Sequence, residues 1–399
     1  MNIKKYINSI IRKKLIKKLN KFSTYKIIFT DELGVWTIGE GNKIINVKIL
    51  NPDFYLMIFS GGSNGIANAY TKGYWECDKL YELFRAFVRN IELLDSLESG
   101  YLKFDILKNR LIYILSSNSK SGSKKNIHAH YDLGNNFFKL FLDDTMTYSS
   151  AIFESENSSL QDASINKLDI ICKKINLNES HHILEIGGGW GSFAIYAAEN
   201  YGCEVTTTTI SQQQFEYMEK KFSDLGLRKR IHLLNEDYRN LSGCYDKIVS
   251  IEMIEAVGDQ FLGVFFSMCS KLLAPGGQML LQSITMPDER YPKYLKNTDF
   301  IQTYIFPGSC VPSLAAIKNA LSRNTNLTIG HTENIALHYS KTLLYWLNNF
   351  NKNELRIKEL GYDESFLRLW RYYLYYCAAG FQEQYLGDLQ ILLNKKNTD

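Results

Sequence analysis

The stretch HILEIGGGWGSF, residues 182–193, decides the fold expected for this 399-residue chain. An apolar run ends in Glu185, and the glycines 187, 189 and 191 lead into a helix-like segment. Glycines at such a turn let backbone N–H groups approach a ligand and let the helix pack close to the strand. The pattern predicts a strand, a ligand-binding loop and a helix, with a purely structural tight turn as the alternative.

Outward from this stretch, short apolar runs alternate with segments of helix length. The runs lie at 183–186, 205–210, 231–234, 247–251 and 279–284. This alternation predicts a parallel, doubly wound α/β sheet with helices on both faces. Ser158 with Gln161 predicts a capping box that opens a helix through about Lys174. The aromatic-rich sequence beyond residue 286 indicates an inserted lid before one or two final strands.

The first third of the chain has a different organisation. Alternating residues at 26–60 predict three or four strands, and three- and four-residue apolar spacing predicts a helix over 66–94. Residues 116–125 (SSNSKSGSKK) are small and polar, as in a flexible linker. We therefore expect a small mixed α+β domain at 1–115, a linker at 116–125 and a catalytic domain at 126–399.

Charge is concentrated at the start of the chain. Residues 1–21 hold eight Lys or Arg and no acid, although the whole chain has a net charge of only +4. Nucleic-acid binding by the whole surface is therefore not implied. Apolar residues at helical spacing within the segment predict an amphipathic helix on an anionic membrane surface, or a helix packed on its own domain. These apolar residues are Ile3, Ile7, Ile10, Ile11, Leu15 and Leu19.

Composition narrows the setting of the protein. The sequence contains no run of about 18 uncharged apolar residues, so we expect no transmembrane helix. The seven cysteines are scattered without a CxxC pair, which argues against a disulfide framework or a metal site and favours a reducing cytoplasm. We expect a cytoplasmic protein that associates peripherally with the inner face of the membrane.

The sequence around the glycine loop favours one cofactor over another. A dinucleotide site expects an acid at the end of the second strand, but that strand ends in ThrThrThrThrIle, 206–210. Glu185, directly before the glycines, instead suits S-adenosylmethionine, which needs no phosphate cradle.

Nine blocks in one order resemble the cyclopropane-fatty-acyl-phospholipid synthases, a family of S-adenosylmethionine-dependent lipid-modifying enzymes. The blocks are HYDLGNNFF (130–138), MTYSSAIF (146–153), LEIGGGWGSFA (184–194), TTISQQQ (208–214), EDYRNL (236–241), DKIVSIEMIEAVG (246–258), LLQSI (280–284), YIFPGSCVPS (304–313) and HYSKTLLYW (338–346). The segment AYTKGYWECDKLYELF (69–84) resembles the family's small N-terminal domain. The resemblance implies a class I methyltransferase-type Rossmann-like domain with a helical lid.

The resemblance also implies which residues contact the cofactor. Together with Glu185 they are Tyr148, Ser149, Gly187, Gly189, Thr209, Ile210, Gln214, Asp237 and Tyr238. Tyr238 has an alternative interpretation as a core aromatic.

The implied reaction adds a methylene group to the cis double bond of an unsaturated phospholipid acyl chain. The π electrons attack the cofactor's methyl group, a carbocation forms, and a bound bicarbonate ion removes a proton so that a cyclopropane ring closes. The implied pocket residues are Glu255, Tyr339, Ser150, Gln282 and the backbone near Ile284. Glu255 has the alternative role of capping the next helix.

This chain departs from the family pattern at three positions. Ser150 stands where Cys is usual, Gln282 stands where many bacterial members have His, and Ala256 also replaces a His. A changed pocket leaves two alternatives open: a lipid C-methyltransferase that yields methyl- or methylene-branched chains, and an inactive lipid-binding protein. A homodimer is also left open.

Overall fold

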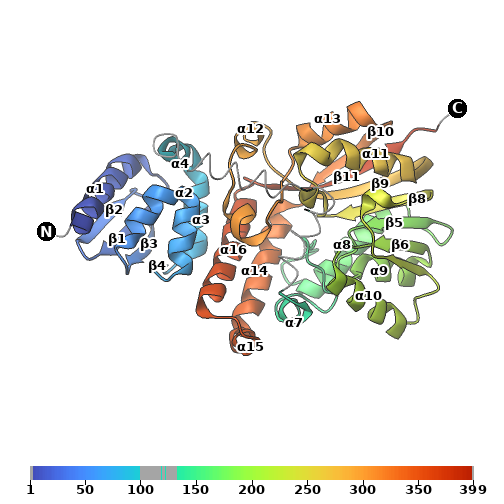
Figure 1. The fold of residues 1–399 in the computed structure, drawn as a ribbon, viewed down its shortest axis with the longest axis horizontal. Helices are drawn as coiled ribbons and strands as arrows, with labels where there is room; N and C mark the ends of the chain where they lie inside the picture. Colours follow the sequence, from blue (N-terminus) through green and yellow to red (C-terminus); the bar gives the residue numbers. More distant parts are fainter. Residues whose placement is uncertain (1–2, 99–117, 119–121, 123–132, 398–399) are drawn as a thin grey trace.

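The computed structural model describes residues 3–98, 118, 122 and 133–397, and its larger part is built on a seven-stranded sheet (Figure 1). The strand order is β10-β11-β9-β8-β5-β6-β7, and β11 alone among them runs antiparallel to its neighbours. The strands are β5 (His182–Ile186), β6 (Glu204–Thr208), β7 (Ile231–Leu234), β8 (Tyr245–Ile251), β9 (Leu273–Thr285), β10 (Leu327–Asn334) and β11 (Gly387–Lys395). The predicted α/β sheet is confirmed, and each predicted run falls on a strand.

Successive strand residues point to opposite faces, and each face is covered by helices. Ile183 packs into a cluster with α8 (Leu160–Lys174), α9 (Ser192–Tyr201) and α10 (Gln212–Asp224). Its neighbour Leu184 packs on the other face with α11 (Leu262–Leu272) and α13 (Leu314–Asn324). Both faces are therefore buried, which explains why the strands are continuous apolar runs.

The described N-terminal residues, 3–98, form a separate small unit that we call the N-terminal lobe. Its sheet has the order β2-β1-β3-β4, formed by β1 (Tyr25–Asp31), β2 (Gly34–Ile38), β3 (Lys43–Ile49) and β4 (Trp75–Cys77). Its helices are α1 (Ile3–Lys18), α2 (Asp53–Thr71), α3 (Leu80–Arg89) and α4 (Ile91–Glu98). The short 3-10 helix η1 (Leu19–Lys21) follows α1. The predicted small mixed α+β unit is present.

Helices near the C-terminus join the two units. After the short helix α7 (Asn135–Phe138), the lid region contains α12 (Tyr291–Tyr294), the π-helix η5 (Ile301–Ile305), α14 (Ala336–Lys352), α15 (Glu354–Glu359) and α16 (Glu364–Gln382). In the view of Figure 1, α14 and α16 stand between the N-terminal lobe and the large sheet. Arg85 and Arg89 of α3 both form ion pairs with Glu383, directly after α16, at 2.6 and 2.7 Å.

Three local predictions are wrong. Residues 66–94 are not one helix, because α2 ends at Thr71 and β4 intervenes before α3. The strands predicted up to residue 60 stop at Ile49, since α2 begins at Asp53. Helix α8 is capped by Ser159, whose hydroxyl accepts from the Asp162 N–H, one residue later than the predicted Ser158.

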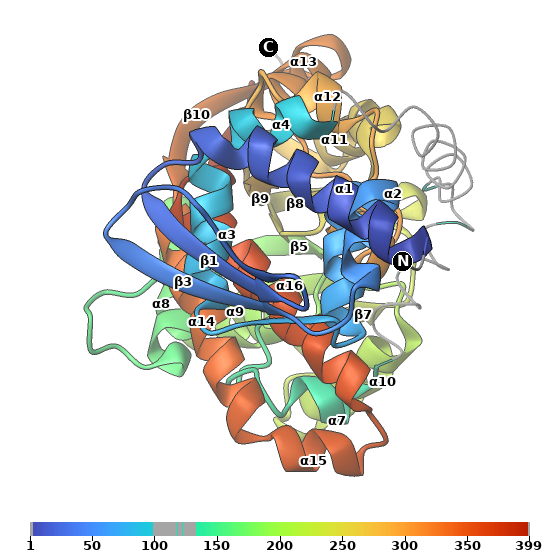
Figure 2. The same cartoon turned by 90° about the vertical axis from the view of Figure 1, so that its left-hand side faces the viewer.

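The basic first helix packs on its own lobe. The side chains of Asn8, Ile11 and Leu19 are buried, and Arg12 forms an ion pair with Asp31 at 3.0 Å. Figure 2 shows α1 lying across the lobe in front of α2. Among the described residues, no helix is long and apolar enough to cross a bilayer. The predicted linker, residues 116–125, lies outside the described residues except for 118 and 122.

Candidate functional site

A cavity of about 760 Å³ connects the carboxyl ends of the large sheet's central strands with the helices of the N-terminal lobe. Such edges are where α/β sheets bind ligands, because the helices diverge there and leave a crevice. The volume lies in the range of about 300–1,000 Å³ typical of small-molecule sites. The cavity has a polar end at the glycine loop, a cluster of carboxyl groups at its centre and an apolar end against the N-terminal lobe.

The polar end collects the ten residues predicted to contact the cofactor. Every one of them lines the cavity: Tyr148, Ser149, Glu185, Gly187, Gly189, Thr209, Ile210, Gln214, Asp237 and Tyr238. They come from the carboxyl end of β5 and the loop after it, from the segments that follow β6 and β7, and from the segment before α8. Sequence positions 90 residues apart thus meet on one surface, because parallel strands end at the same edge.

This end of the cavity fits an S-adenosylmethionine molecule. The side-chain amide Nε2 of Gln214 is buried without a hydrogen-bond partner among the described residues. A donor left in this state costs free energy unless a ligand accepts from it, and a ligand carboxylate suits it. A Cβ added to Gly189 would meet open space, so the loop backbone borders directly on the cavity. Tyr238 lines the cavity and also packs edge-on against Phe265. Its environment is therefore compatible with both predicted roles, cofactor contact and core aromatic.

A buried lysine stands beside this end. Lys167 of α8 is 1 % exposed, and its Nζ donates to the Ser149 hydroxyl at 2.8 Å. Burial lowers the pKa of Lys167 to about 8, against the opposing charges of Glu252 and Asp388. The carboxylate of Glu185 accepts from the Thr207 hydroxyl at 2.6 Å, and burial raises its pKa to about 7.

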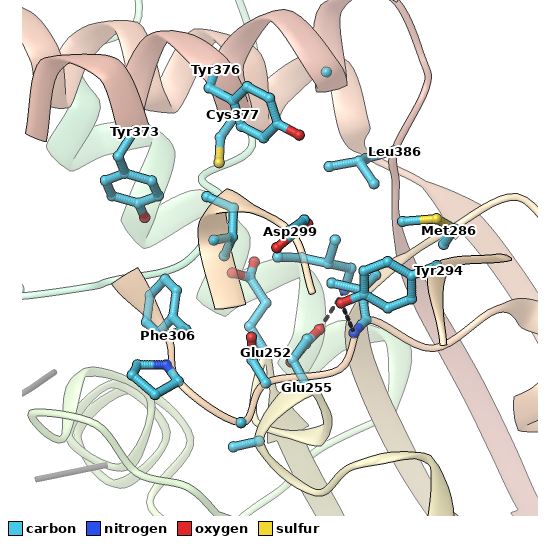
Figure 3. A pocket seen from close by; sticks show the side chains of 18 of the residues that line it. Glu252, Glu255, Met286, Tyr294, Asp299, Phe306, Tyr373, Tyr376, Cys377 and Leu386 are labelled. Carbon is cyan, nitrogen blue, oxygen red and sulfur yellow. Dashed lines mark hydrogen bonds between the residues drawn. The ribbon is translucent and has the colours of Figure 1, made fainter. Parts of the chain in front are cut away.

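The centre of the cavity is organised around Glu252, which the sequence analysis missed. Its Oε1 accepts from the Ser150 N–H and from Gln282 Nε2, both at 2.8 Å. Its Oε2 accepts from the Tyr339 hydroxyl at 2.6 Å. Three of the predicted pocket residues therefore converge, but they converge on a side chain of this protein (Figure 3 shows Glu252 at the cavity).

The two other predicted pocket residues pair with each other. Glu255 Oε1 accepts from the Ile284 N–H at 2.6 Å, while Glu255 Oε2 is buried without a hydrogen-bond partner among the described residues. Burial and the neighbouring Glu252 charge raise the pKa of Glu255 to about 8. Glu255 lies inside the 3-10 helix η3 (Ile254–Ala256), so the alternative that it caps a following helix is not what the structure shows.

Bicarbonate does not fit the pocket as the residues now stand. The Ser150 N–H, the Gln282 amide and the Tyr339 hydroxyl are the donors that the family resemblance directs at the ion, and Glu252 accepts from all three. The Ser150 hydroxyl donates to its neighbour's carbonyl, Ala151 O, at 3.0 Å. A second anion here would face the Glu252 carboxylate without these donors.

A further carboxyl group, Asp388 of β11, lies behind Gln282. Its Oδ2 accepts from Gln282 Nε2 at 3.2 Å, and its side chain is fully buried. Burial and the charges of Glu252 and Glu255 raise the pKa of Asp388 well above its usual range. Burial also raises the pKa of Glu252, while its hydrogen bonds from Tyr339, Ser150 and Gln282 lower it and favour the ionised carboxylate.

The apolar end of the cavity extends into the N-terminal lobe. Side chains from four of its helices line it: Ile11, Leu15, Ile58, Phe59, Ile66, Phe84, Phe87, Val88, Ile91 and Leu94. On the opposite side the wall is aromatic, with Phe306, Tyr373 and Tyr376 near the carboxyl cluster (Figure 3). A long apolar ligand fits this shape, since the walls supply apolar area and few polar partners.

Glu252 and Lys167 were not predicted from the sequence, for different reasons. Glu252 stands three residues before Glu255 in the motif EMIEAVG, and both carboxyls follow β8 directly. The position of Glu252 at the carboxyl end of a strand could have marked it as a candidate site residue. Nothing in the sequence indicates that Lys167 is buried, because a lysine within an amphipathic helix is expected to face solvent.

Comparison with known proteins agrees with this geometry. The family model for mycolic acid cyclopropane synthetase matches residues 118–391. The tuberculostearic acid methyltransferase of Mycobacterium tuberculosis is 31% identical over 391 residues, which covers 96% of this chain and 90% of that protein. The cyclopropane-fatty-acyl-phospholipid synthase of Escherichia coli K12 is 32% identical over 356 residues, or 89% of each chain.

Solved structures agree as well. A mycolic acid cyclopropane synthase complexed with SAH and CTAB superposes with a TM-score of 0.64 at 32% identity, over 68% of this chain and 98% of that one. The expected S-adenosylmethionine-dependent methyltransferase fold is thereby confirmed.

Proposed function

The chain belongs to the mycolic acid cyclopropane synthetase family of S-adenosylmethionine-dependent lipid-modifying enzymes, and we propose that it adds a methylene group to the cis double bond of an unsaturated phospholipid acyl chain. The observation that carries the proposal is the single cavity in which a glycine loop, a carboxyl cluster and an apolar channel meet. The glycine loop suits the cofactor, the channel suits an acyl chain, and the carboxyl cluster lies between them.

The cofactor, when bound, supplies an electrophilic methyl group on a sulfonium sulfur. The residues of the polar end then have distinct tasks in holding it. Gln214 Nε2 would donate to its carboxylate, and the Gly187–Gly189 backbone would lie against it. Glu185, with its raised pKa, would balance its positive charge once ionised. Ser149, held by Lys167, fixes the segment that carries Tyr148.

The surrounding side chains suit a reaction through a carbocation. An alkene is a poor nucleophile, and water would trap the resulting cation, so the site must be dry. Tyr148 packs near Trp346, with ring centroids 5.1 Å apart, and its hydroxyl lies 3.1 Å from the Tyr373 hydroxyl. Such aromatic faces stabilise a cation without reacting with it.

The N-terminal lobe would bring the acyl chain to this site. Lys13, Lys17 and Lys21 are exposed on α1 and η1, while Lys14, Leu15 and Ile11 of the same helix line the apolar end of the cavity. We propose that this helix meets the anionic inner face of the membrane and that the protein is peripherally bound there in the cytoplasm.

A C-methyltransferase that yields a branched chain is the second candidate. The observation in its favour is the 31% identity over 96% of the chain to a tuberculostearic acid methyltransferase. The two outcomes share a cation and differ in whether a hydride migrates before the proton is lost. A base beside the transferred methyl serves both, so the position of the double bond relative to that base decides the product.

The test is incubation of the purified protein with S-adenosylmethionine carrying a CD₃ group and vesicles of an unsaturated phospholipid. Cyclopropanation retains two of the three deuterium atoms in a ring, which mass spectrometry and proton NMR of the released acyl chains identify together. An exocyclic methylene group retains the same two deuterium atoms but lacks the ring methine protons, and a methyl-branched alkene, formed by loss of a proton from the acyl chain, retains all three. An unlabelled acyl chain would contradict the proposed function and favour a lipid-binding protein.

A further inference from the structure

The donor set around Glu252 assigns this residue a role beyond packing. One N–H, one amide and one hydroxyl, from residues 150, 282 and 339, all reach its two oxygens within 2.8 Å. Three segments far apart in the sequence have thus been brought together to hold one carboxylate. Its side chain is half-buried, because it faces the cavity instead of the protein core.

The backbone at Glu252 is strained in a way that fixes this placement. Its φ is +48°, in the left-handed region that residues other than glycine rarely adopt. Its N–H donates to the Gln282 carbonyl at 2.8 Å, which holds the turn at the end of β8. Strain of this kind persists where the surrounding structure enforces it, and it gathers at functional sites.

The neighbouring groups favour the ionised form of the Glu252 carboxylate and orient it. The positive charge of the buried Lys167 lowers the pKa of Glu252 against the effect of burial, and the pKa of Asp388, behind Gln282, is raised well above its usual range. The Gln282 amide is itself oriented, since its oxygen accepts from Gln390 Nε2 at 3.0 Å. Gln282 must therefore present its N–H groups, and not its oxygen, to the two acids.

We propose that the carboxylate of Glu252 is the base of the reaction, in the place that the family resemblance gives to bicarbonate. The inference rests on the proposed function. The alkene's π pair forms a bond to the transferred carbon while the carbon–sulfur bond breaks toward sulfur. Glu252 Oε2 then takes a proton from the new methyl group, and the freed C–H pair closes the ring. Oε2 accepts from Tyr339 and retains a further acceptor position for that proton.

The first test removes the side chain and offers bicarbonate in its place. Glu252→Gly is compatible with the positive φ, and it leaves the three donors facing an ion-sized space. In buffer stripped of carbon dioxide, we expect the wild type to keep full turnover and Glu252→Gly to be about 10²- to 10⁴-fold slower. Added bicarbonate should restore much of the variant's rate and leave the wild type unchanged.

The second test needs no turnover. Calorimetric titration of bicarbonate into each protein, saturated with S-adenosylhomocysteine, should give binding to Glu252→Gly and none to the wild type. Glu252→Gln, which keeps the volume but cannot take a proton, should lose the same 10²- to 10⁴-fold in rate without rescue. Its affinity for S-adenosylhomocysteine should stay within about twofold of the wild type. Glu199→Gln, on the exposed surface of α9, is the matched control that should change neither quantity.

The outcomes separate the two proposals. A wild type that modifies lipid but stalls without bicarbonate overturns the assignment of Glu252 and leaves the function intact. Full activity of Glu252→Gln overturns it as well. A wild type that modifies no unsaturated lipid in either buffer instead overturns the proposed function, and the base assignment with it.

Discussion

At the scale of single residues, the site is a set of buried charges arranged around a cationic cofactor. Glu185, Glu252, Glu255 and Asp388 line or adjoin one cavity, and Lys167 is the buried cation among them. Burial is the largest cause that raises the pKa of each acid, neighbouring carboxylates add to it at Glu255 and Asp388, and the donors around Glu252 favour the ionised form of that residue. The site therefore gains affinity for a positive ligand and remains partly protonated without one.

This balance makes cofactor affinity depend on pH. Burial raises the pKa of Glu185 to about 7, so the carboxyl is mostly protonated below that pH in the empty site. A cationic ligand favours the ionised form, so binding must release the proton, and affinity rises with pH until about 7. We expect S-adenosylmethionine, which carries the sulfonium charge, to bind roughly tenfold more weakly near pH 6 than near pH 8 by calorimetry.

The control for this pH dependence is Glu185→Gln, which keeps the hydrogen bond with Thr207 within reach but cannot titrate. Its affinity should be lower near pH 8 and nearly independent of pH in this range. A wild-type affinity that does not vary, with no proton released in buffers of different ionisation heat, would contradict this role of Glu185.

Residue by residue, the sequence predicts the cofactor end better than the catalytic centre. Of the ten residues predicted to contact the cofactor, eight lie at or after the ends of strands that the apolar runs already indicate, and all ten line one cavity. The centre depends instead on which acceptor occupies the space between residues 150, 282 and 339, and spacing along the chain carries no such information. The sequence analysis therefore found the donors and missed Glu252.

At the scale of elements, the glycine loop between β5 and α9 has two kinds of position. A Cβ on Gly188 would lie 2.1 Å from Thr207 Oγ1, whereas a Cβ on Gly189 would meet open space in the cavity. Gly188 is therefore required by the packing of the protein itself, and Gly189 borders the cavity. Substituting the second should affect binding far more than folding.

Gly189→Val tests this division. Its φ of +55° should cost about 1–2 kcal/mol of stability, and its side chain should occupy cofactor space and weaken S-adenosylhomocysteine binding by more than about 100-fold. Gly202→Val, at the end of α9 with φ +68°, is the control: the backbone cost is similar but the residue does not line the cavity. Equal binding by both variants, measured by calorimetry beside their Tm values, would remove Gly189 from the cofactor site.

Element prediction failed where a local turn outweighed periodicity. Apolar spacing continues through residues 66–94, but Gly73 adopts a φ of +72°, and the chain turns there into β4. Glycine permits this conformation without Cβ strain, and no property of the periodic apolar residues reveals it. The five central strand runs were predicted correctly because burial on both faces makes their apolar character continuous.

At the scale of the whole molecule, the cavity belongs to both lobes. The cofactor end is built on the large sheet, and the apolar end on α1–α4, so neither lobe alone encloses an acyl chain. Asp95 of α4 forms ion pairs with Arg290 and Lys293 beside the lid, at 2.8 and 2.7 Å. The N-terminal lobe is thus a wall of the site, and its outer helix is close to where a lipid would enter.

The last prediction concerns α1 and tests whether this helix binds the membrane from which the lipid would come. Deleting the helix would remove the buried Asn8 and Ile11 and disturb the lobe, so a change of charge is the better test. Lys13 and Lys17 are exposed, and each lysine near an anionic surface contributes about 1 kcal/mol.

Replacing both with Gln should weaken binding to phosphatidylglycerol vesicles by roughly 30-fold. The lipid KM should rise, and cofactor affinity should stay unchanged. Lys220→Gln with Lys229→Gln, exposed in α10 and shortly after it, makes the same charge change and should leave vesicle binding intact, since α10 lies well away from α1 in Figure 1. Binding of the wild type should also fall as salt screens the lysines, so salt-independent binding, or equal loss in both double variants, would show that α1 serves only to pack its lobe.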